Sequence, residues 1–433
     1  MSTLSKKINT GKMVEVMGNI AANRYMVAMR NAYAPLVPVT LIGALFVIVL
    51  NIPIEAWTNF IAPFAAKLQI PMTFSMEVMA IYICVGMACA LCEIYKLDKV
   101  STSVMAILAF FITAVTPAWI DPEVAKKAGI AVSGTVLPTT NLGAGGIFTG
   151  IIISVFTVEV AHFCQKKKIT IKMPPGVPSA VADSFAALIP GLFTILVVWG
   201  IRVGLNFDVN NALRWVFSPI RAFTGDNILS VIIPILLITL FWFIGIHGMA
   251  IVTPLLSPFW TESFLANVHA AGAGKPIPHF VTGDFFVWFV WIGGAGATFA
   301  LAFLMAFFGK SAFSRKLGRF TVIPGLFNIN EPLVFGAPIV MNPFFAIPFI
   351  CAPLAMGIIT YLANVLHLVS YPFATAPWMI PAPIGAFLAC GLDWRALVLS
   401  LFNVVVAIAI YFPFFKAFDK KMLAEELDHS KEK

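Results

Sequence analysis

The sequence predicts an all-α membrane protein that crosses the bilayer many times. Hydrophobic residues make up 60% of the 433 residues and charged residues only 11%, and the mean hydropathy is +0.93. Soluble domains carry about 25% charged residues. The formal net charge is +8, but Lys and Arg gather at the chain ends and in short loops, as membrane topology requires. Nucleic acid is therefore not an expected partner, whereas membrane lipid is.

Apolar stretches set the expected number of spans, because a helix needs about 20 mainly apolar residues to cross the hydrocarbon core. Ten stretches meet this length, at 33–51, 76–94, 100–119, 144–164, 184–205, 227–246, 284–308, 344–364, 372–391 and 394–415. No small-residue cleavage site marks a signal peptide before the first stretch. We expect about ten transmembrane helices.

An even number of spans places both termini on one side, and basic residues indicate that this side is the cytoplasm. The N-terminal basic residues are Lys6, Lys7, Lys12, Arg24 and Arg30, and the C-terminal ones are Lys416, Lys420 and Lys421. The loop after the fourth span carries Lys166, Lys167, Lys168 and Lys172. A further basic patch at Lys310, Arg315, Lys316 and Arg319 falls outside by simple parity. We attribute this conflict to re-entrant hairpins.

Two apolar segments are unsuited to continuous helix. Prolines 254 and 258 interrupt residues 247–264, and residues 321–343 contain four prolines and two glycines. Proline removes a backbone donor and breaks the helical hydrogen-bond ladder. Transporters place substrate sites at such broken helices, so we expect two re-entrant hairpins there.

The chain is expected to have two functional halves. Residues 206–226 mix charged, polar and aromatic side chains in the pattern of an interfacial amphipathic helix, which would act as a connector. Residues 1–205 would form a five-helix half that serves scaffolding and dimerisation. Residues 227–433 would form the half that binds and transports substrate.

Glu331 is the most informative residue, because it is the lone carboxylate in FNINEPLVFGAPIVMNP, residues 327–343. An ionisable group at membrane depth costs about 2.5–3.5 kcal/mol on insertion scales. Irregular backbone there survives only when it is buried in protein or lines a polar cavity. This segment therefore predicts a binding site.

Several separated motifs in order resemble one family. They are MGNIAANRYMVAMRNAYAPLVPVTLIG at 17–43, PPGVPSAVADSFAALIP at 174–190, FWFIGIHG at 241–248, WIGGAGAT at 291–298, residues 327–343 and APWMIPAPIGAFLACGLDWRA at 376–396. Together they resemble the enzyme IIC permeases of the bacterial phosphotransferase system, in the lactose, cellobiose and diacetylchitobiose group. The resemblance implies a homodimer in the bacterial cytoplasmic membrane that imports a sugar while the sugar is phosphorylated.

The resemblance also assigns roles to residues. Glu331 and His247 match the family's catalytic glutamate and histidine, which would hold or deprotonate a sugar hydroxyl. The residues expected to contact the sugar are Asn328, Asn330, Trp378, Trp242, Gly293, Gly294 and Gly296. Amides supply hydrogen bonds, indoles stack on sugar rings, and glycines allow close backbone approach.

Structural roles compete with these functional ones. A lone His in an apolar run is usually a core residue, Trp often forms an interfacial belt, and glycines serve close helix packing. The chain also departs from the family pattern at Val287, Trp288 and Ala295, and Asp284 does not stand where relatives carry an acid. These departures leave the particular disaccharide open.

The sequence contains no phosphocysteine domain, so we expect a separate phosphorylated enzyme IIB, with IIA, HPr and enzyme I upstream. The chain would be the membrane part of a sugar phosphotransferase only together with IIB and IIA. No GxxxxGK[ST] loop or metal-ligand cluster is present in the sequence, and no cofactor is expected. Two alternatives are a proton-coupled sugar transporter, in which Glu331 carries the proton, and a sugar sensor that does not transport.

Overall fold

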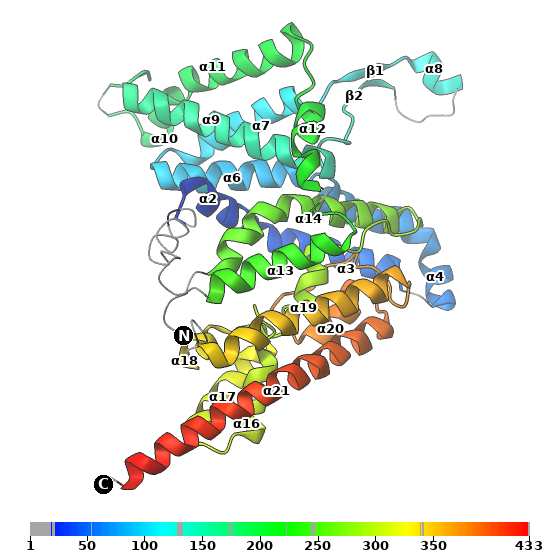
Figure 1. Ribbon diagram of the computed structural model, residues 1–433. Coiled ribbons are helices and arrows are strands. Elements are labelled where there is room, and N and C mark those ends of the chain that lie inside the picture. The colour runs from blue at the N-terminus through cyan, green and yellow to red at the C-terminus, as the bar shows by residue number, and fades with distance from the viewer. Residues whose placement is uncertain are drawn as a thin grey trace. The chain divides into compact units, whose positions relative to one another are not determined.

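The computed structural model describes residue 19 and residues 22–431, apart from 53, 128–132, 172, 175, 222, 244–246, 338, 340 and 341. The predicted topology residues Lys6, Lys7, Lys12 and Lys172 lie outside the described residues. The described chain separates into two compact units (Figure 1). The smaller unit contains Arg24–Gly43 and Ile70–Pro219, and the larger unit contains Ala44–Gln69 and Ile220 onward.

Helices dominate both units, and the only strands among the described residues are β1 (Ala118–Ile120) and β2 (Gly134–Val136), which pair antiparallel. The first helices are α2 (Arg24–Tyr33), α3 (Val37–Leu50), α4 (Glu55–Ile61), α5 (Ala65–Met72), α6 (Met79–Tyr95), α7 (Lys99–Ala114), α8 (Pro122–Lys127), α9 (Ile147–Lys167), α10 (Ser179–Ala186), α11 (Leu188–Trp199) and α12 (Val209–Arg221). The later helices are α13 (Ile228–Phe243), α14 (Gly248–Gly272), α15 (Gly283–Phe289), α16 (Phe299–Phe308), α17 (Ala312–Leu326), α18 (Glu331–Gly336), α19 (Pro343–Val365), α20 (Ala382–Ala389) and α21 (Trp394–Lys431). The all-α class is confirmed for the described residues.

In the smaller unit, α6 packs against α7 and α9, and α11 packs against α7 and α9. Helix α12 lies within the segment predicted as amphipathic, and its Asn210 is buried and accepts a hydrogen bond from the Thr149 hydroxyl at 2.6 Å. Its Trp215 is 78% exposed. Asn210 thus attaches α12 to the smaller unit, while the apolar Trp215 side chain is exposed, as expected for an interfacial helix.

Six continuous helical runs in the described residues are long and apolar enough to cross a membrane: Arg24–Leu50, Glu55–Tyr95, Ala144–Lys167, Val181–Gly204, Phe344–Val365 and Trp394–Asp428. Lys99–Ala114, Ile228–Phe243 and Phe299–Phe308 are apolar but shorter. Ten full-length spans are therefore not confirmed. The predicted spans 100–119 and 227–246 correspond to the shorter helices α7 and α13, and the largest differences lie in the predicted spans 284–308 and 372–391.

The predicted span 284–308 is broken into α15 and α16 by an irregular loop at 290–298. Gly293, Gly294, Gly296 and Ala297 have positive φ angles, which are incompatible with a continuous right-handed helix. In the predicted span 372–391 only α20 is helical, because prolines 372, 377 and 381 interrupt the chain before it.

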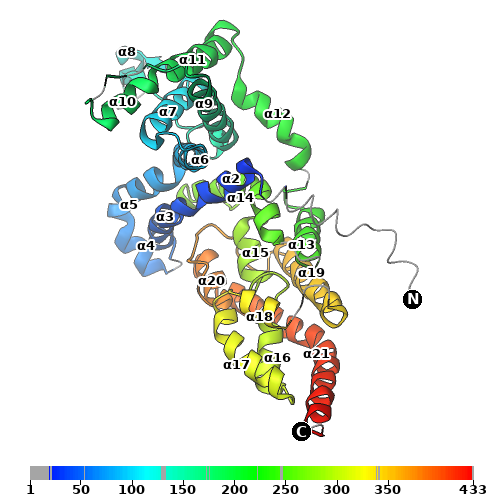
Figure 2. The ribbon, with the colours of Figure 1, turned by 90° about the vertical axis from the view of Figure 1, so that its left-hand side faces the viewer.

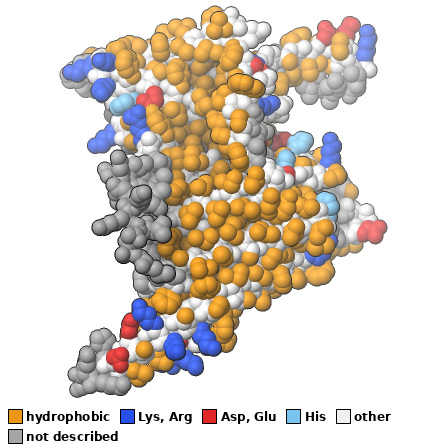
Figure 3. Space-filling view, in the orientation of Figure 1, with side chains coloured by type: hydrophobic (Ala, Val, Ile, Leu, Met, Phe, Trp, Pro, Cys, Tyr) orange, Lys and Arg blue, Asp and Glu red, His pale blue; other side chains and the backbone are white. Residues whose placement is uncertain are grey.

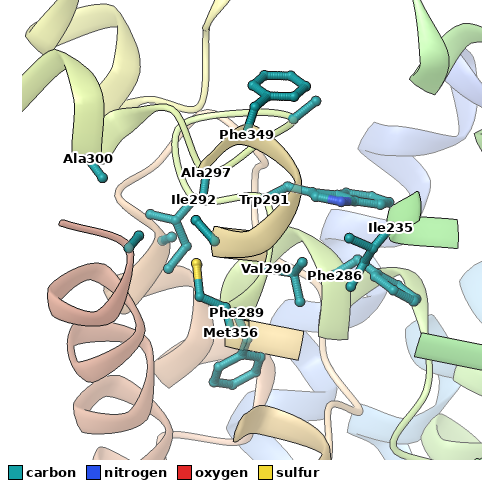
Figure 4. Packing of buried hydrophobic residues seen from close by; sticks show 14 of the residues in the cluster. Ile235, Phe286, Phe289, Val290, Trp291, Ile292, Ala297, Ala300, Phe349 and Met356 are labelled. Carbon is teal, nitrogen blue, oxygen red and sulfur yellow. The ribbon is translucent and has the colours of Figure 1, made fainter. Parts of the chain in front are cut away.

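The broken segment lies in the core of the larger unit, among Phe286, Phe289, Trp291, Phe349 and Met356 (Figure 4). One face of α21 donates three hydrogen bonds to carbonyls of α15 and of the 290–298 loop. The Ser400 hydroxyl donates to the Trp288 carbonyl, the Asn403 amide to the Phe289 carbonyl and the Tyr411 hydroxyl to the Gly296 carbonyl, at 2.8, 2.8 and 2.7 Å. Irregular backbone at this depth is tolerated because protein groups satisfy it.

The two predicted hairpins have different outcomes. Residues 248–272 form one continuous helix, so prolines 254 and 258 do not turn the chain within 247–264, and that hairpin is not confirmed. In 321–343 the helix does break, since α17 ends at Leu326 and α18 begins at Glu331 (Figure 2). The depth of this turn in a membrane stays a prediction.

The basic patch that conflicted with parity lies beside the C-terminal part of α21. Asp419 accepts hydrogen bonds from the backbone N–H groups of Lys310 and Ser311 at 2.7 and 3.1 Å, and Glu426 accepts from Ala312 and Phe313 at 2.9 and 2.8 Å. Exposed basic side chains gather at this end of the unit (Figure 3), at Lys310, Arg315, Lys316, Arg319, Lys416, Lys420 and Lys421. The patch and the basic C-terminal part of α21 therefore lie at the same end of the larger unit. The attribution of the parity conflict to re-entrant hairpins stays a prediction.

Candidate functional site

Glu331 is the first residue of α18, and Pro332 follows it at a position where proline suits a helix start. The preceding turn, residues 327–330, breaks the helix between α17 and α18. The Glu331 side chain is 50% exposed. The sequence therefore folds locally so that this acid is accessible.

His247 stands at the N-cap of α14, where its Nδ1 accepts a hydrogen bond from the Ala250 N–H at 3.1 Å. When Nδ1 is an acceptor, the neutral ring carries its proton on Nε2. That Nε2 lies 4.0 Å from Oε1 of Glu331. The cap thus directs a potential donor toward the carboxylate.

The distance between His247 and Glu331 is too long for a direct hydrogen bond. An oxygen placed beside the line that joins the two atoms can lie about 2.8 Å from both, which is the normal range for a hydroxyl contact. Both side chains are about half exposed, at 48% and 50%. The pair can therefore hold one hydroxyl group, which His247 contacts as donor and Glu331 as acceptor.

Trp242 supports this pair from the interior. It is 3% exposed, and its ring centroid lies 4.4 Å from that of His247 with a 46° angle between the planes. An indole buried in this way packs against the imidazole and limits its motion. Its geometry favours support of His247 over broad stacking on a ligand.

Asn328 joins three segments through its side chain. Its Oδ1 accepts from the Gly293 N–H at 3.0 Å, and its Nδ2 donates to the carbonyls of Trp378 and Ile380 at 2.8 and 3.2 Å. Its φ of 63° places it in the left-handed region, which Asn tolerates better than most residues. Asn328 therefore fixes the turn before Glu331.

Asn330, two residues further along the same turn, also bonds to the 290–298 loop. It is 5% exposed, and its Nδ2 donates to the Ala295 carbonyl at 3.0 Å. A Cβ on Gly294 would lie 2.5 Å from Cγ of Asn330, so only glycine fits there. The Asn330 amide and the 290–298 loop thus interlock.

The three predicted glycines meet protein atoms in this structure. A Cβ on Gly293 would lie 2.3 Å from Cβ of Phe299, and one on Gly296 would lie 2.2 Å from the Phe349 ring. The close approach that these glycines permit is to neighbouring side chains. Contact between their backbone and a sugar stays a prediction.

Trp378 is 48% exposed, and its backbone carbonyl is held by Asn328. An accessible indole attached to the turn before Glu331 has the exposure that stacking on a sugar ring needs. The structure thus links Trp378 to the same turn through its backbone.

Two of the three positions that depart from the family pattern, Trp288 and Ala295, make contacts within the larger unit. Trp288 is 1% exposed and donates its indole N–H to Oδ1 of Asp284 at 2.8 Å. Its ring packs on Gly385, where a Cβ would lie 2.1 Å from it. Asp284 is therefore engaged with Trp288, and Ala295 contributes its carbonyl to Asn330.

Sequence reasoning missed the residues that support the site. Ser400, Asn403 and Tyr411 are fully buried, and Thr298 donates to the Gly293 carbonyl at 2.6 Å. The available signal was their spacing, since residues 400, 403 and 411 share one face of an apolar helix. Among the described residues, no group of three or more His, Cys, Asp or Glu side chains could hold a metal ion.

Comparison with known proteins gives consistent matches over the chain. The family described as "Phosphotransferase system, EIIC" matches residues 30–353. The cellobiose-specific EIIC component of Geobacillus stearothermophilus is 36% identical over 96% of this chain and 94% of its own. The lactose-specific EIICB component of Streptococcus mutans is 30% identical over 99% of this chain and 74% of its own.

A solved structure is also similar. The crystal structure of ChbC, the IIC component of the N,N'-diacetylchitobiose-specific phosphotransferase system, matches with a TM-score of 0.86 and 33% identity. The match covers 95% of this chain and 97% of that chain.

Proposed function

The chain belongs to the EIIC family of the phosphotransferase system, a family of multi-pass permeases, and from that membership we propose that it imports a β-linked disaccharide coupled to phosphorylation. The observation that carries the proposal is the 4.0 Å approach of His247 to Glu331, with both side chains half exposed. These are the two residues that a hydroxyl of the sugar would need. The proposed substrate class rests on relatives named for cellobiose, lactose and diacetylchitobiose.

In the proposed reaction the sugar's 6-hydroxyl lies between the two side chains. The His247 Nε2–H donates to the hydroxyl oxygen, and a Glu331 carboxylate oxygen accepts the hydroxyl proton. The oxygen attacks the phosphorus of a phosphocysteine on a partner protein, so that an O–P bond forms and the S–P bond breaks. The cysteine leaves as a thiolate, and the hydroxyl proton passes to Glu331.

Binding would come from the residues around this pair. Trp378 would stack on an apolar sugar face, because its ring is accessible while its backbone is fixed by Asn328. Trp242 would hold the His247 ring. Asn328, Asn330 and the glycines of the 290–298 loop would shape the site, and direct amide contacts to sugar hydroxyls remain part of the proposal.

We propose that the phosphoryl donor is a separate enzyme IIB, supplied by IIA, HPr and enzyme I. A relative that carries both functions in one chain, the EIICB component of Streptococcus mutans, supports direct cooperation of the two parts. The chain would work as a homodimer in the bacterial cytoplasmic membrane with both termini in the cytoplasm. Residues 1–205 would provide the scaffold and dimer contacts, and residues 227–433 would bind and move the sugar.

The deciding experiment uses proteoliposomes and radiolabelled cellobiose, lactose and diacetylchitobiose, with and without phosphorylated IIB. The internal sugar is then identified by chromatography. Sugar phosphate that appears only with IIB supports the proposal. Free sugar accumulating under a proton gradient alone would instead identify a proton-coupled transporter, and binding without any accumulation would identify a sensor.

Glu331→Gln tests the role of the carboxylate. The variant keeps the shape and some hydrogen bonding but cannot take the proton, and a positioned general base contributes about 10²–10⁴-fold to a rate. We expect sugar phosphate formation to fall by about that factor. Glu123→Gln, a change of an exposed acid in the first turn of α8, is the matched control and should retain the wild-type rate. A wild-type rate for Glu331→Gln would remove this residue from the mechanism.

A further inference from the structure

A cavity lies in the larger unit, where the C-terminal end of α14 meets the turn between α20 and α21. It has a volume of about 740 Å³, within the usual range for small-molecule sites. Its polar wall contains Asn51, Lys275, Ser370, Asp393, Trp394 and Arg395. Neither Glu331 nor His247 lines it.

The floor of this cavity is held in place by backbone geometry. Gly391 has a φ of 67°, and a Cβ there would lie 2.3 Å from the Phe373 ring. The backbone N–H groups of Phe373 and Ala374 both donate to the Ala389 carbonyl, at 3.0 and 3.1 Å. The turn is therefore packed against the 370–374 segment. This packing fixes the backbone that carries Asp393, Trp394 and Arg395.

Asp393 and Arg395 form a fork within the wall. The Arg395 Nε and Nη2 groups donate to the two Asp393 oxygens, each at 2.9 Å, and the Ser370 N–H donates to the same carboxylate at 2.8 Å. Partial burial raises the pKa of Asp393, but the hydrogen bonds from Arg395 and Ser370 together hold it below its usual range. Both groups are thus charged near neutral pH.

The Asp393–Arg395 ion pair leaves some Arg395 N–H groups available to a ligand. Arg395 has five side-chain N–H groups, and within the described residues only two of them form hydrogen bonds. Beside it the Trp394 ring is 67% exposed, and Lys275 is also exposed. A flat indole next to fixed donors suits a sugar, whose apolar ring face stacks while its hydroxyls form hydrogen bonds.

The two sites occupy opposite ends of one helix. His247 caps the start of α14, whereas Lys275 follows its end at Gly272. At a rise of 1.5 Å per residue, its 25 residues span about 37 Å, more than the hydrocarbon thickness of a bilayer. The 740 Å³ cavity and the His247–Glu331 pair therefore lie at opposite ends of α14.

We propose that this cavity is an entry site that binds the disaccharide weakly on the outer side before it reaches Glu331. The inference rests on the proposed function and its orientation, in which both termini are cytoplasmic. Asn51 then follows the first span and Trp394 begins the last one, which puts both on the outer side. An entry site would raise the local sugar concentration at the mouth of the transport path.

The test measures binding without the partner protein. Nanodiscs that contain Glu331→Gln are mixed with millimolar cellobiose, lactose or diacetylchitobiose, and saturation-transfer NMR reports residual binding. We expect residual binding to at least one sugar, which Trp394→Ala removes and Trp394→Phe retains, because phenylalanine keeps a stacking ring. Trp119→Ala is the matched control, since Trp119 is a 69% exposed indole of the smaller unit.

Uptake kinetics supply the second readout. Trp394→Ala and Lys275→Gln should raise the KM for uptake by about 3- to 10-fold, as expected for losing one stacking or hydrogen-bonding contact, while the maximal rate changes little. No residual binding in Glu331→Gln, or binding that Trp394→Ala leaves intact, would overturn the entry site. Absence of sugar phosphate in the wild type would overturn the proposed reaction instead, because the binding readout does not require IIB.

Discussion

His247 uses its two ring nitrogens for different tasks. Nδ1 caps α14 by accepting from Ala250, and this leaves Nε2 facing Glu331. The cap thereby fixes both the tautomer and the direction of the ring. Loss of the ring would remove a structural contact and a candidate sugar contact together, so the two roles need a variant that separates them.

His247→Asn provides that separation. The Asn oxygen can replace Nδ1 as the cap, because Asn is among the preferred N-cap residues, but no atom replaces Nε2. We expect an unchanged melting temperature in detergent and a sugar affinity about 10-fold weaker, the usual effect of one lost hydrogen bond with a charged neighbour. His247→Ala should lower both. Wild-type affinity in His247→Asn would exclude Nε2 from sugar binding.

Gly294 shows how tightly the site is built, since the space for its side chain is filled by Asn330. Gly294→Ala adds a Cβ against a buried amide at a φ of 89°, and overpacking with backbone strain costs about 2–4 kcal/mol. We expect a melting temperature clearly below that of the wild type. Gly283→Ala, where no atom lies within 4 Å of the added Cβ, is the control. Equal melting temperatures for Gly294→Ala and Gly283→Ala would contradict close packing of Asn330 against Gly294.

At the scale of elements, the irregular loop between α15 and α16 depends on α21. Ser400, Asn403 and Tyr411 lie on one face of that helix and satisfy carbonyls that α15 and the loop leave open. Polar residues in an apolar helix usually indicate a function or a partner. Here the partner is the backbone of the same unit, and the result is a fixed support for Asn328, Asn330 and the turn before Glu331.

Asn403→Leu tests this support. The change leaves the buried Phe289 carbonyl without its amide donor, at about 1–3 kcal/mol for the orphaned group. It also removes the bond from the amide to the Thr360 hydroxyl, which still donates to the Met356 carbonyl. We expect a lower melting temperature and a lower uptake rate. Val405→Ala, on the exposed side of α21, should change neither, since Val405 is 60% exposed. If Asn403→Leu lowers the melting temperature but leaves the uptake rate unchanged, then transport does not depend on this support of the 290–298 loop.

At the scale of the molecule, the larger unit has two chemically different ends. Its basic end combines the start of α17 with the C-terminal part of α21, joined by Asp419 and Glu426. Positive charge accumulates on the cytoplasmic side of membrane proteins. The other end carries the cavity at Lys275 and Arg395.

Thiol labelling of sealed right-side-out vesicles can check this orientation. Arg315→Cys and Lys420→Cys should resist a membrane-impermeant reagent until the vesicles are opened, whereas Lys275→Cys should react at once. The parent protein supplies the background from its own cysteines, of which Cys351 is exposed. Immediate labelling of Arg315→Cys would place the patch outside, where simple parity puts it.

Local sequence patterns determined much of this protein. Composition and apolar run length gave the all-α membrane class, and prolines with glycine predicted a break in the 321–343 segment, because both patterns depend on neighbouring residues only. The break falls at residues 327–330, where Asn328 is left-handed, whereas Pro324 and Gly325 lie inside α17. The accessible Glu331 was also predictable, since a lone carboxylate in an apolar segment needs a polar surrounding. The amphipathic pattern at 206–226 likewise corresponds to α12.

Tertiary structure decided what those residues contact. Residues 284–308 have the composition of a span, yet left-handed glycines break them and α21 stabilises the break from more than 100 positions away in the chain. Asn328 and Asn330 have amides that suit a sugar, yet their described bonds are to backbone of the same unit. Sequence patterns report hydropathy and period, whereas these contacts depend on which distant groups fold to within about 3 Å of each other.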